Sequence, residues 1–148
     1  MSEWFAIPML FAAGLFAGGV TSIALERVPA WRATQLSEFQ TGFAYTLRRV
    51  DRVQPALLVV SLVSTIGFAL GAEGPARTSA LLATACFLIV LVGSVAWLVP
   101  AQRRLVISGT EQPPRQMERL RSQWLRGHWI RTVVALIALS LAIVAAVL

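Results

Sequence analysis

A chain of 148 residues, of which 57% are hydrophobic and 14% charged, differs from soluble domains, where about 25% of residues are charged. This length accommodates one domain and leaves no room for a helical bundle plus a separate globular module. The net charge is +6, but the arginines stand between apolar runs, which indicates membrane topology rather than nucleic-acid binding.

Four apolar runs of membrane-spanning length follow one another along the chain. About 20 helical residues cross the hydrocarbon core of a bilayer, and uncharged runs cover residues 4–25, 53–72 and 78–102. The last run, residues 132–148, is shorter, so we expect its helix to begin earlier. The sequence therefore predicts an all-α fold, an integral membrane four-helix bundle with up-down topology and a single domain over residues 1–148. The spans are expected at about residues 4–25, 53–72, 78–102 and 126–148.

The first run differs from a signal peptide because no basic segment precedes it and because it exceeds the usual apolar length of 7–15 residues. Within it, Gly14 and Gly18 form a G-x-x-x-G pattern that Gly19 extends. Small residues at this spacing let helix backbones approach closely. We therefore expect Gly14 and Gly18 to lie at a helix contact.

The segments between the runs differ in character. Residues 37–50 carry spaced apolar side chains, which predicts an interfacial amphipathic stretch or an early start of the second helix. Glu73-Gly74-Pro75 predicts a tight turn between the second and third spans. The third run holds Cys86, the single cysteine, which excludes a disulfide framework and a thiolate metal cluster. After Pro113-Pro114, residues 115–127 predict a charged helical lead-in to the fourth span.

The arginines predict the orientation. Residues 26–52 and 103–131 together hold 12 of the 13 basic residues. Basic residues concentrate in cytoplasmic segments of membrane proteins. Both segments are therefore expected in the cytoplasm and both termini outside, in the cell inner (plasma) membrane.

A candidate site lies at the start of the fourth span. Trp124, His128 and Arg131 follow one another at spacings of four and three, which places them on one face of a helix. His128 is the single histidine of the chain. One interpretation is an interfacial belt that reaches the lipid headgroups, and the other is a functional site.

Polar residues of the other three spans are expected at the same depth. Glu26 ends the first span, Gln54 opens the second and Gln102 closes the third. Polar groups within a membrane bundle face its interior or a watery cavity. We therefore expect a site that opens at the cytoplasmic mouth of the bundle.

Two segments resemble a known family. The run Val99-Pro100-Ala101-Gln102-Arg103-Arg104-Leu105, followed by Trp124-x-x-x-His128-x-x-Arg131, is similar to motifs of the anthrone oxygenase-like (DUF1772) family of small four-span membrane proteins. The family pattern has Asn where this chain has Gln102. The glycine-rich first span and the hydropathy profile also resemble the family.

The resemblance implies an oxygenase that converts anthrones to anthraquinones. On the matching positions it implies His128 as the general base, with Arg131 and Gln102 stabilising the enolate oxygen. Trp124 would stack on the flat substrate, and Glu26 and Gln54 are expected to bind substrate as well. The implied partners are the lipid bilayer, a small lipophilic or aromatic substrate and O2, with no nucleic acid, and a homo-oligomer is left open.

Haem is a rival role for the same histidine. His128 as axial ligand and Arg131 near a propionate would suit a cofactor held between helices. The alternative to an oxygenase is a non-catalytic membrane protein, namely a haem or small-molecule binder or an accessory subunit. A transporter is disfavoured because the spans lack charged residues at their centres and paired helix breaks.

Overall fold

The computed structural model describes residues 3–50, 53–107 and 113–148, and helices make up almost all of these ranges. Four of the helices are long and apolar enough to cross a membrane, and they cover Glu3–Ala33, Gln54–Gly71, Gly74–Val106 and Pro114–Val147. The described residues contain no strand. The prediction of an all-α membrane helical bundle is confirmed.

The first and third spanning helices each contain one π-helical turn. The first consists of α1 (Glu3–Ser22), η1 (Ile23–Arg27) and α2 (Val28–Ala33), and the third of α5 (Gly74–Gly93), η2 (Ser94–Leu98) and α6 (Val99–Ile107). Pro29 and Pro100 each lie two residues after the π-helical turn. In a regular helix, a proline ring clashes with the carbonyl four residues earlier. Here that carbonyl lies within the π-helical turn, and the wider turn relieves the clash.

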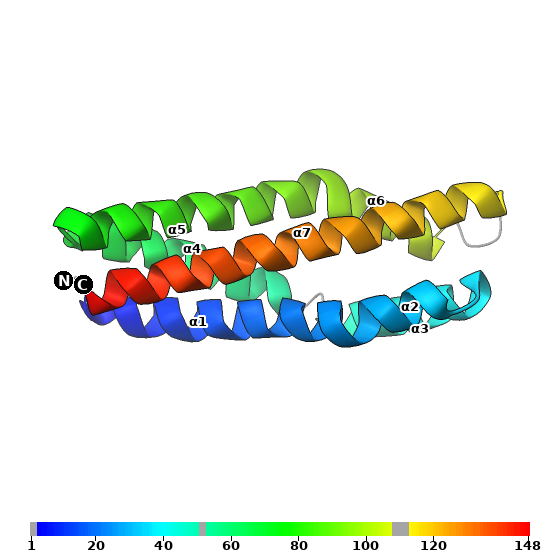
Figure 1. Ribbon diagram of the computed structural model, residues 1–148, viewed down its shortest axis with the longest axis horizontal. Helices are drawn as coiled ribbons and strands as arrows, with labels where there is room; N and C mark the ends of the chain where they lie inside the picture. Colours follow the sequence, from blue (N-terminus) through cyan, green and yellow to red (C-terminus); the bar gives the residue numbers. More distant parts are fainter. Residues whose placement is uncertain (1–2, 51–52, 108–112) are drawn as a thin grey trace.

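The two breaks share a sequence pattern, which corrects the expectation that the spans lack paired helix breaks. Val28-Pro29-Ala30-Trp31-Arg32 and Val99-Pro100-Ala101-Gln102-Arg103 both read Val-Pro-Ala-x-Arg. Both helices run toward the same end of the bundle (Figure 1). The π-helical turns therefore lie at a similar depth in the bundle.

The second and fourth spanning helices are unbroken. They are α4 (Gln54–Gly71) and α7 (Pro114–Val147). The predicted helical lead-in before the fourth span is correct, because α7 continues without a break from Pro114 into the apolar run. The helix is longer than the expected span of residues 126–148.

Neighbouring spanning helices run in opposite directions (Figure 1). α1 contacts α4 and α7, and α5 contacts the same two helices. The core between them consists of small side chains with single large ones, such as Ala17 and Ala138 beside Phe16 and Phe87. The beginning of α1 and the end of α7 lie at the same end of the bundle (Figure 1).

A short amphipathic helix, α3 (Leu36–Val50), lies at the opposite end. Phe39 and Phe43 are buried, whereas Arg48 and Arg49 are exposed. Of the two alternatives for this segment, the structure shows a helix that is separate from the second span. Its phenyl rings contact the Trp31 ring of α2 and thereby hold α3 against the bundle.

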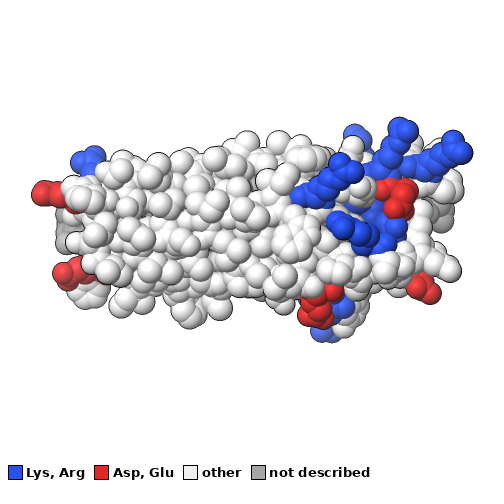
Figure 2. Space-filling view, viewed as in Figure 1, with Lys and Arg blue, Asp and Glu red and all other residues white. Residues whose placement is uncertain are grey.

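Charge is distributed unequally between the two ends of the molecule. The arginine-rich end is formed by α2, α3, α6 and the first turns of α7, and Figure 2 shows the blue side chains gathered there. The opposite end carries Glu3, Glu73 and Arg77, and Arg52 lies outside the described residues. The multi-pass membrane fold is clear, while the orientation of the arginine-rich end toward the cytoplasm stays a prediction.

The expected role of Gly14 and Gly18 is wrong. A Cβ atom added at either glycine would meet no atom within 4 Å, so neither glycine mediates a close helix approach. Gly19 does so instead, because an added Cβ would overlap the side-chain amide of Gln54 on α4.

Candidate functional site

His128 is completely buried between the helices of the bundle, with 0% of its surface exposed. Its Nε2 atom is 3.0 Å from the carbonyl oxygen of Val20 on α1. Its Nδ1 atom is 2.8 Å from a guanidinium nitrogen of Arg131. A carbonyl accepts and a guanidinium donates, so Nε2 carries the proton and Nδ1 accepts. These partners select the neutral imidazole with the proton on Nε2.

Thr132 reinforces the contact between α7 and α1. Its hydroxyl is 2.9 Å from the carbonyl oxygen of His128 and 3.4 Å from that of Val20. The side chains of His128 and Thr132 therefore both contact the Val20 carbonyl of α1, three residues before the π-helical turn η1. Thr132 directly follows the fourth-span motif but was assigned no role from the sequence, although it follows His128 by four residues and so lies on the same helix face.

Trp124 holds the His128 ring in place. The two rings are stacked, with centroids 5.1 Å apart and planes inclined by 21°. Phe43 packs edgewise against Trp124 at 4.7 Å and Trp31 at 5.8 Å, and only 3% of Trp124 is exposed. This corrects the expected role of Trp124 as an open platform, since the ring is already covered by protein side chains.

Arg131 connects this buried cluster to a pocket on the side of the bundle. The pocket has a volume of about 90 Å³ and lies between α5, η2 and α7. Most of its lining is apolar, and its polar side chains are those of Arg131 and Ser94. Exposed Ile89, Gly93 and Ile130 border it. Because these residues belong to spanning helices, the pocket opens toward the lipid.

Several buried polar atoms near this level have no hydrogen-bond partner among the described residues. They come from all four spanning helices and include Thr21 Oγ1, Gln54 Oε1, Ser94 Oγ and Trp124 Nε1. Such atoms are rare in folded proteins and are usually satisfied by water or a ligand. The prediction that all four helices contribute polar groups at one depth is therefore supported, although Thr21 and Ser94 were not among the expected residues.

The remaining expected residues are placed differently. Gln54 lies inside the bundle against Gly19, and Gln102 is half-buried on α6. Glu26 is exposed, forms a 3.7 Å ion pair with Arg27 and borders a surface groove toward α3. The structure therefore joins Trp124, His128 and Arg131 directly and leaves Glu26 outside this cluster.

The donor set of the site does not suit a metal or haem. Among the described residues, no group of three or more His, Cys, Asp and Glu side chains could hold a metal ion. Axial ligation requires space for a porphyrin beside the ring, whereas His128 is fully buried, its ring is stacked on Trp124, and the pocket beside Arg131 has a volume of only about 90 Å³. The arrangement thus does not fit axial ligation of haem.

A sequence model of the family described as anthrone oxygenase matches residues 43–141. The match covers more than half of the chain and includes Ser94, His128 and Arg131. The chain belongs to the anthrone oxygenase family. The part that matches the anthrone oxygenase family begins within α3, so the Val20 carbonyl that binds His128 lies outside it. No curated protein and no solved structure matches the chain.

Proposed function

We propose that this protein is a membrane-embedded oxygenase that acts on a flat, lipophilic aromatic ketone of the anthrone type. The observation that carries the proposal is the position of Arg131. Its guanidinium group is held by the buried, neutral His128 on one side and borders the lipid-facing pocket on the other. A lipophilic substrate would reach this pocket from the bilayer.

The pocket suits one polar edge of such a substrate. Its volume of about 90 Å³ is well below the roughly 300–1,000 Å³ of enclosed ligand pockets. A tricyclic ketone would therefore insert its carbonyl edge and leave its outer rings against the apolar surfaces of α5 and α7. Arg131 and Ser94 would meet the carbonyl oxygen, while apolar residues would meet the rings.

The reaction needs no reductant besides the substrate itself. An anthrone and O2 give an anthraquinone and water: the CH2 carbon becomes a carbonyl with one oxygen atom, and its two hydrogens leave with the other. The first step is loss of a proton from the CH2 group, which forms an enolate that O2 oxidises. The positive charge of Arg131 would stabilise the enolate oxygen.

In this proposal His128 accepts the proton, although its ring lies behind Arg131 and does not itself line the pocket. Its Nδ1 lone pair becomes available when the Arg131 guanidinium turns from the ring toward the substrate oxygen. Trp124 and the Val20 carbonyl would hold the ring meanwhile. Gln102, Gln54 and Glu26 do not border the pocket and take no part in this step. Proton transfer by a positioned histidine typically contributes about 10²–10⁴-fold to the rate.

The complete burial of His128 favours a second candidate, a membrane protein that binds a lipophilic molecule in the same pocket without turnover. In that case His128 has the structural role of holding α7 against α1. The two candidates share the ligand class and differ in whether O2 is consumed.

A pair of glycine substitutions tests the pocket. Gly93 borders it, and an added Cβ there meets nothing within 4 Å, so Gly93→Leu should fill the pocket without disturbing the helix contacts. Gly18→Leu is the matched control, because that Cβ also meets nothing within 4 Å and Gly18 is remote from the pocket lining. We expect anthrone-dependent O2 consumption of the purified protein to fall at least tenfold in Gly93→Leu and to stay unchanged in Gly18→Leu.

In the same assay, Arg131→Gln tests whether Arg131 stabilises the enolate oxygen. Removing one donor to a developing oxyanion costs about 10²–10³ in kcat, whereas Arg119→Gln, an exposed arginine on the same helix, should have no effect. Wild-type protein that binds anthrone but forms no anthraquinone would indicate the binder. Full activity in both Gly93→Leu and Arg131→Gln would show that this pocket is not the site.

A further inference from the structure

A second and larger pocket lies between α2 and the first turns of α7, at the arginine-rich end. Its volume is about 310 Å³, and it is lined by Arg32, Glu118, Arg121, Ser122, Leu125 and Arg126. None of these residues borders the pocket beside Arg131. The pocket is therefore separate from the proposed oxygenase site.

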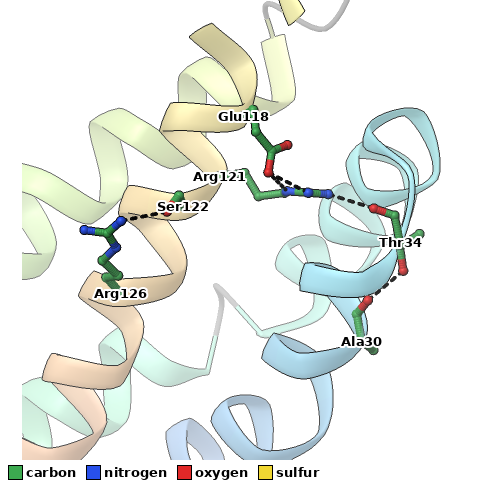
Figure 3. A network of polar contacts seen from close by, with 6 residues as sticks. All are labelled: Ala30, Thr34, Glu118, Arg121, Ser122 and Arg126. Atoms are coloured by element: carbon green, nitrogen blue, oxygen red, sulfur yellow. Dashed lines mark hydrogen bonds and ion pairs between the residues drawn. The ribbon is translucent and has the colours of Figure 1, made fainter. Parts of the chain in front are cut away.

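Arg121 forms a fixed wall of this pocket, and Figure 3 shows its polar contacts from close by. It is 8% exposed and donates to the carbonyl oxygen of Thr34 at 2.8 Å and to the Glu118 carboxylate at 2.7 Å. Its guanidinium group also lies over the Phe39 ring, 5.5 Å from the ring centre. These contacts join α7 to the end of α2, and Glu118 compensates the charge of Arg121.

The other two arginines keep their charge uncompensated. Within the described part of the chain, neither Arg32 nor Arg126 forms an ion pair, and both are exposed. Arg126 donates to the Ser122 hydroxyl at 3.3 Å, as Figure 3 shows. The pocket therefore presents two positive charges and a hydroxyl group against one rigid wall.

The depth of the pocket matches the headgroup region of a bilayer. About 20 residues of a helix cross the hydrocarbon core, and α7 ends at Val147, so the core should end near His128. Arg126 and Ser122 lie within the two turns beyond this boundary, at a rise of about 1.5 Å per residue. Phosphate groups of lipids are found at this level.

We propose that this pocket binds the phosphate group of an anionic phospholipid in the leaflet at the arginine-rich end. The planar fork of a guanidinium group matches phosphate oxygens in pairs, and Ser122 supplies a further donor. Basic pockets between membrane helices near the headgroups recognise anionic lipids. A soluble phosphate offers the same chemistry, but it lacks acyl chains to pack on the adjoining apolar helix surfaces.

The test compares lipid retention in pocket and control variants. Native mass spectrometry of the full chain in a neutral detergent measures the affinity for phosphatidylglycerol, with phosphatidylcholine as the zwitterionic comparison. Arg32→Gln combined with Arg126→Gln removes the two uncompensated charges, and both residues are exposed, so the fold should persist. Arg103→Gln combined with Arg104→Gln removes the same charge from exposed positions on α6.

We expect phosphatidylglycerol to bind about 30-fold more weakly to the pocket variant, since each basic residue near the surface contributes about fivefold. The control variant should lose less than threefold, and phosphatidylcholine should bind weakly to all three proteins. Equal losses in both variants would show a diffuse surface attraction and overturn the proposal. Displacement of the lipid by millimolar inorganic phosphate would overturn the proposal that the ligand is a phospholipid and would assign the pocket to a soluble phosphate. Arg121 is left intact throughout, because it holds α7 to α2.

Discussion

At the scale of single residues, some contacts of His128 were predictable from the sequence and others were not. Trp124, His128 and Arg131 meet as their spacing predicts, because α7 is a regular helix throughout this stretch. The Val20 carbonyl could not be predicted, since it lies 108 positions earlier and is a backbone group. Glu26 was expected at the depth of the site, but it is exposed and borders the groove toward α3, because polarity at the end of a span does not indicate the direction in which a side chain points.

The hydrogen bonds of His128 lead to a spectroscopic prediction. Nε2 faces a carbonyl and Nδ1 faces a guanidinium group, so the ring should be neutral with its proton on Nε2 at neutral pH. Because the chain has one histidine, nitrogen-15 NMR of the ring in detergent micelles reads this state without assignment. One protonated and one unprotonated nitrogen are expected, and in Arg131→Gln the Nδ1 signal should shift. Two protonated nitrogens would contradict the arrangement.

At the scale of helices, glycines and π-helical turns determine which faces approach each other. The G-x-x-x-G pattern was a poor guide, because Gly14 and Gly18 occupy a part of α1 that faces no neighbouring helix closely. Gly127 was not recognised, although it is buried where α7 passes the π-helical turn η2. No periodicity of the sequence alone indicates which glycine meets a partner, because this depends on side chains of other helices, such as Gln54 beside Gly19 and Leu98 beside Gly127.

Two glycine-to-alanine substitutions should change the free energy of unfolding in opposite directions. Gly18→Ala adds a Cβ in open space and should raise the free energy of unfolding by about 0.5–1 kcal/mol, the helix-interior advantage of alanine over glycine. Gly127→Ala places a Cβ 2.7 Å from Leu98 Cδ2, and this overpacking should cost about 1–3 kcal/mol. Thermal unfolding in detergent measures both variants. Equal stabilisation by the two substitutions would mean that Leu98 moves aside freely and that α7 and η2 are not tightly packed.

At the scale of the whole molecule, the arginines and both proposed sites lie toward one end of the bundle. The arginine-rich end carries the phospholipid pocket, and the proposed oxygenase pocket lies just inside the hydrocarbon boundary next to it. The number of spanning helices and the concentration of arginines were predictable, because both follow from composition along the chain. The shapes of the pockets were not, since they depend on the turn at η2 and on the contact between Arg121 and α2.

The orientation in the membrane can be tested by labelling single cysteines at the two ends of the bundle. The arginine-rich end should face the cytoplasm, because basic residues near the ends of spans stay on that side. Glu73 lies between α4 and α5 at the opposite end, and Gln116 lies near the start of α7, and both are exposed. In a Cys86→Ala background, an impermeant maleimide should label Glu73→Cys on intact cells and Gln116→Cys after permeabilisation. The reverse pattern would place the phospholipid pocket in the outer leaflet, and lipid binding would then have to be tested with the lipids of that leaflet.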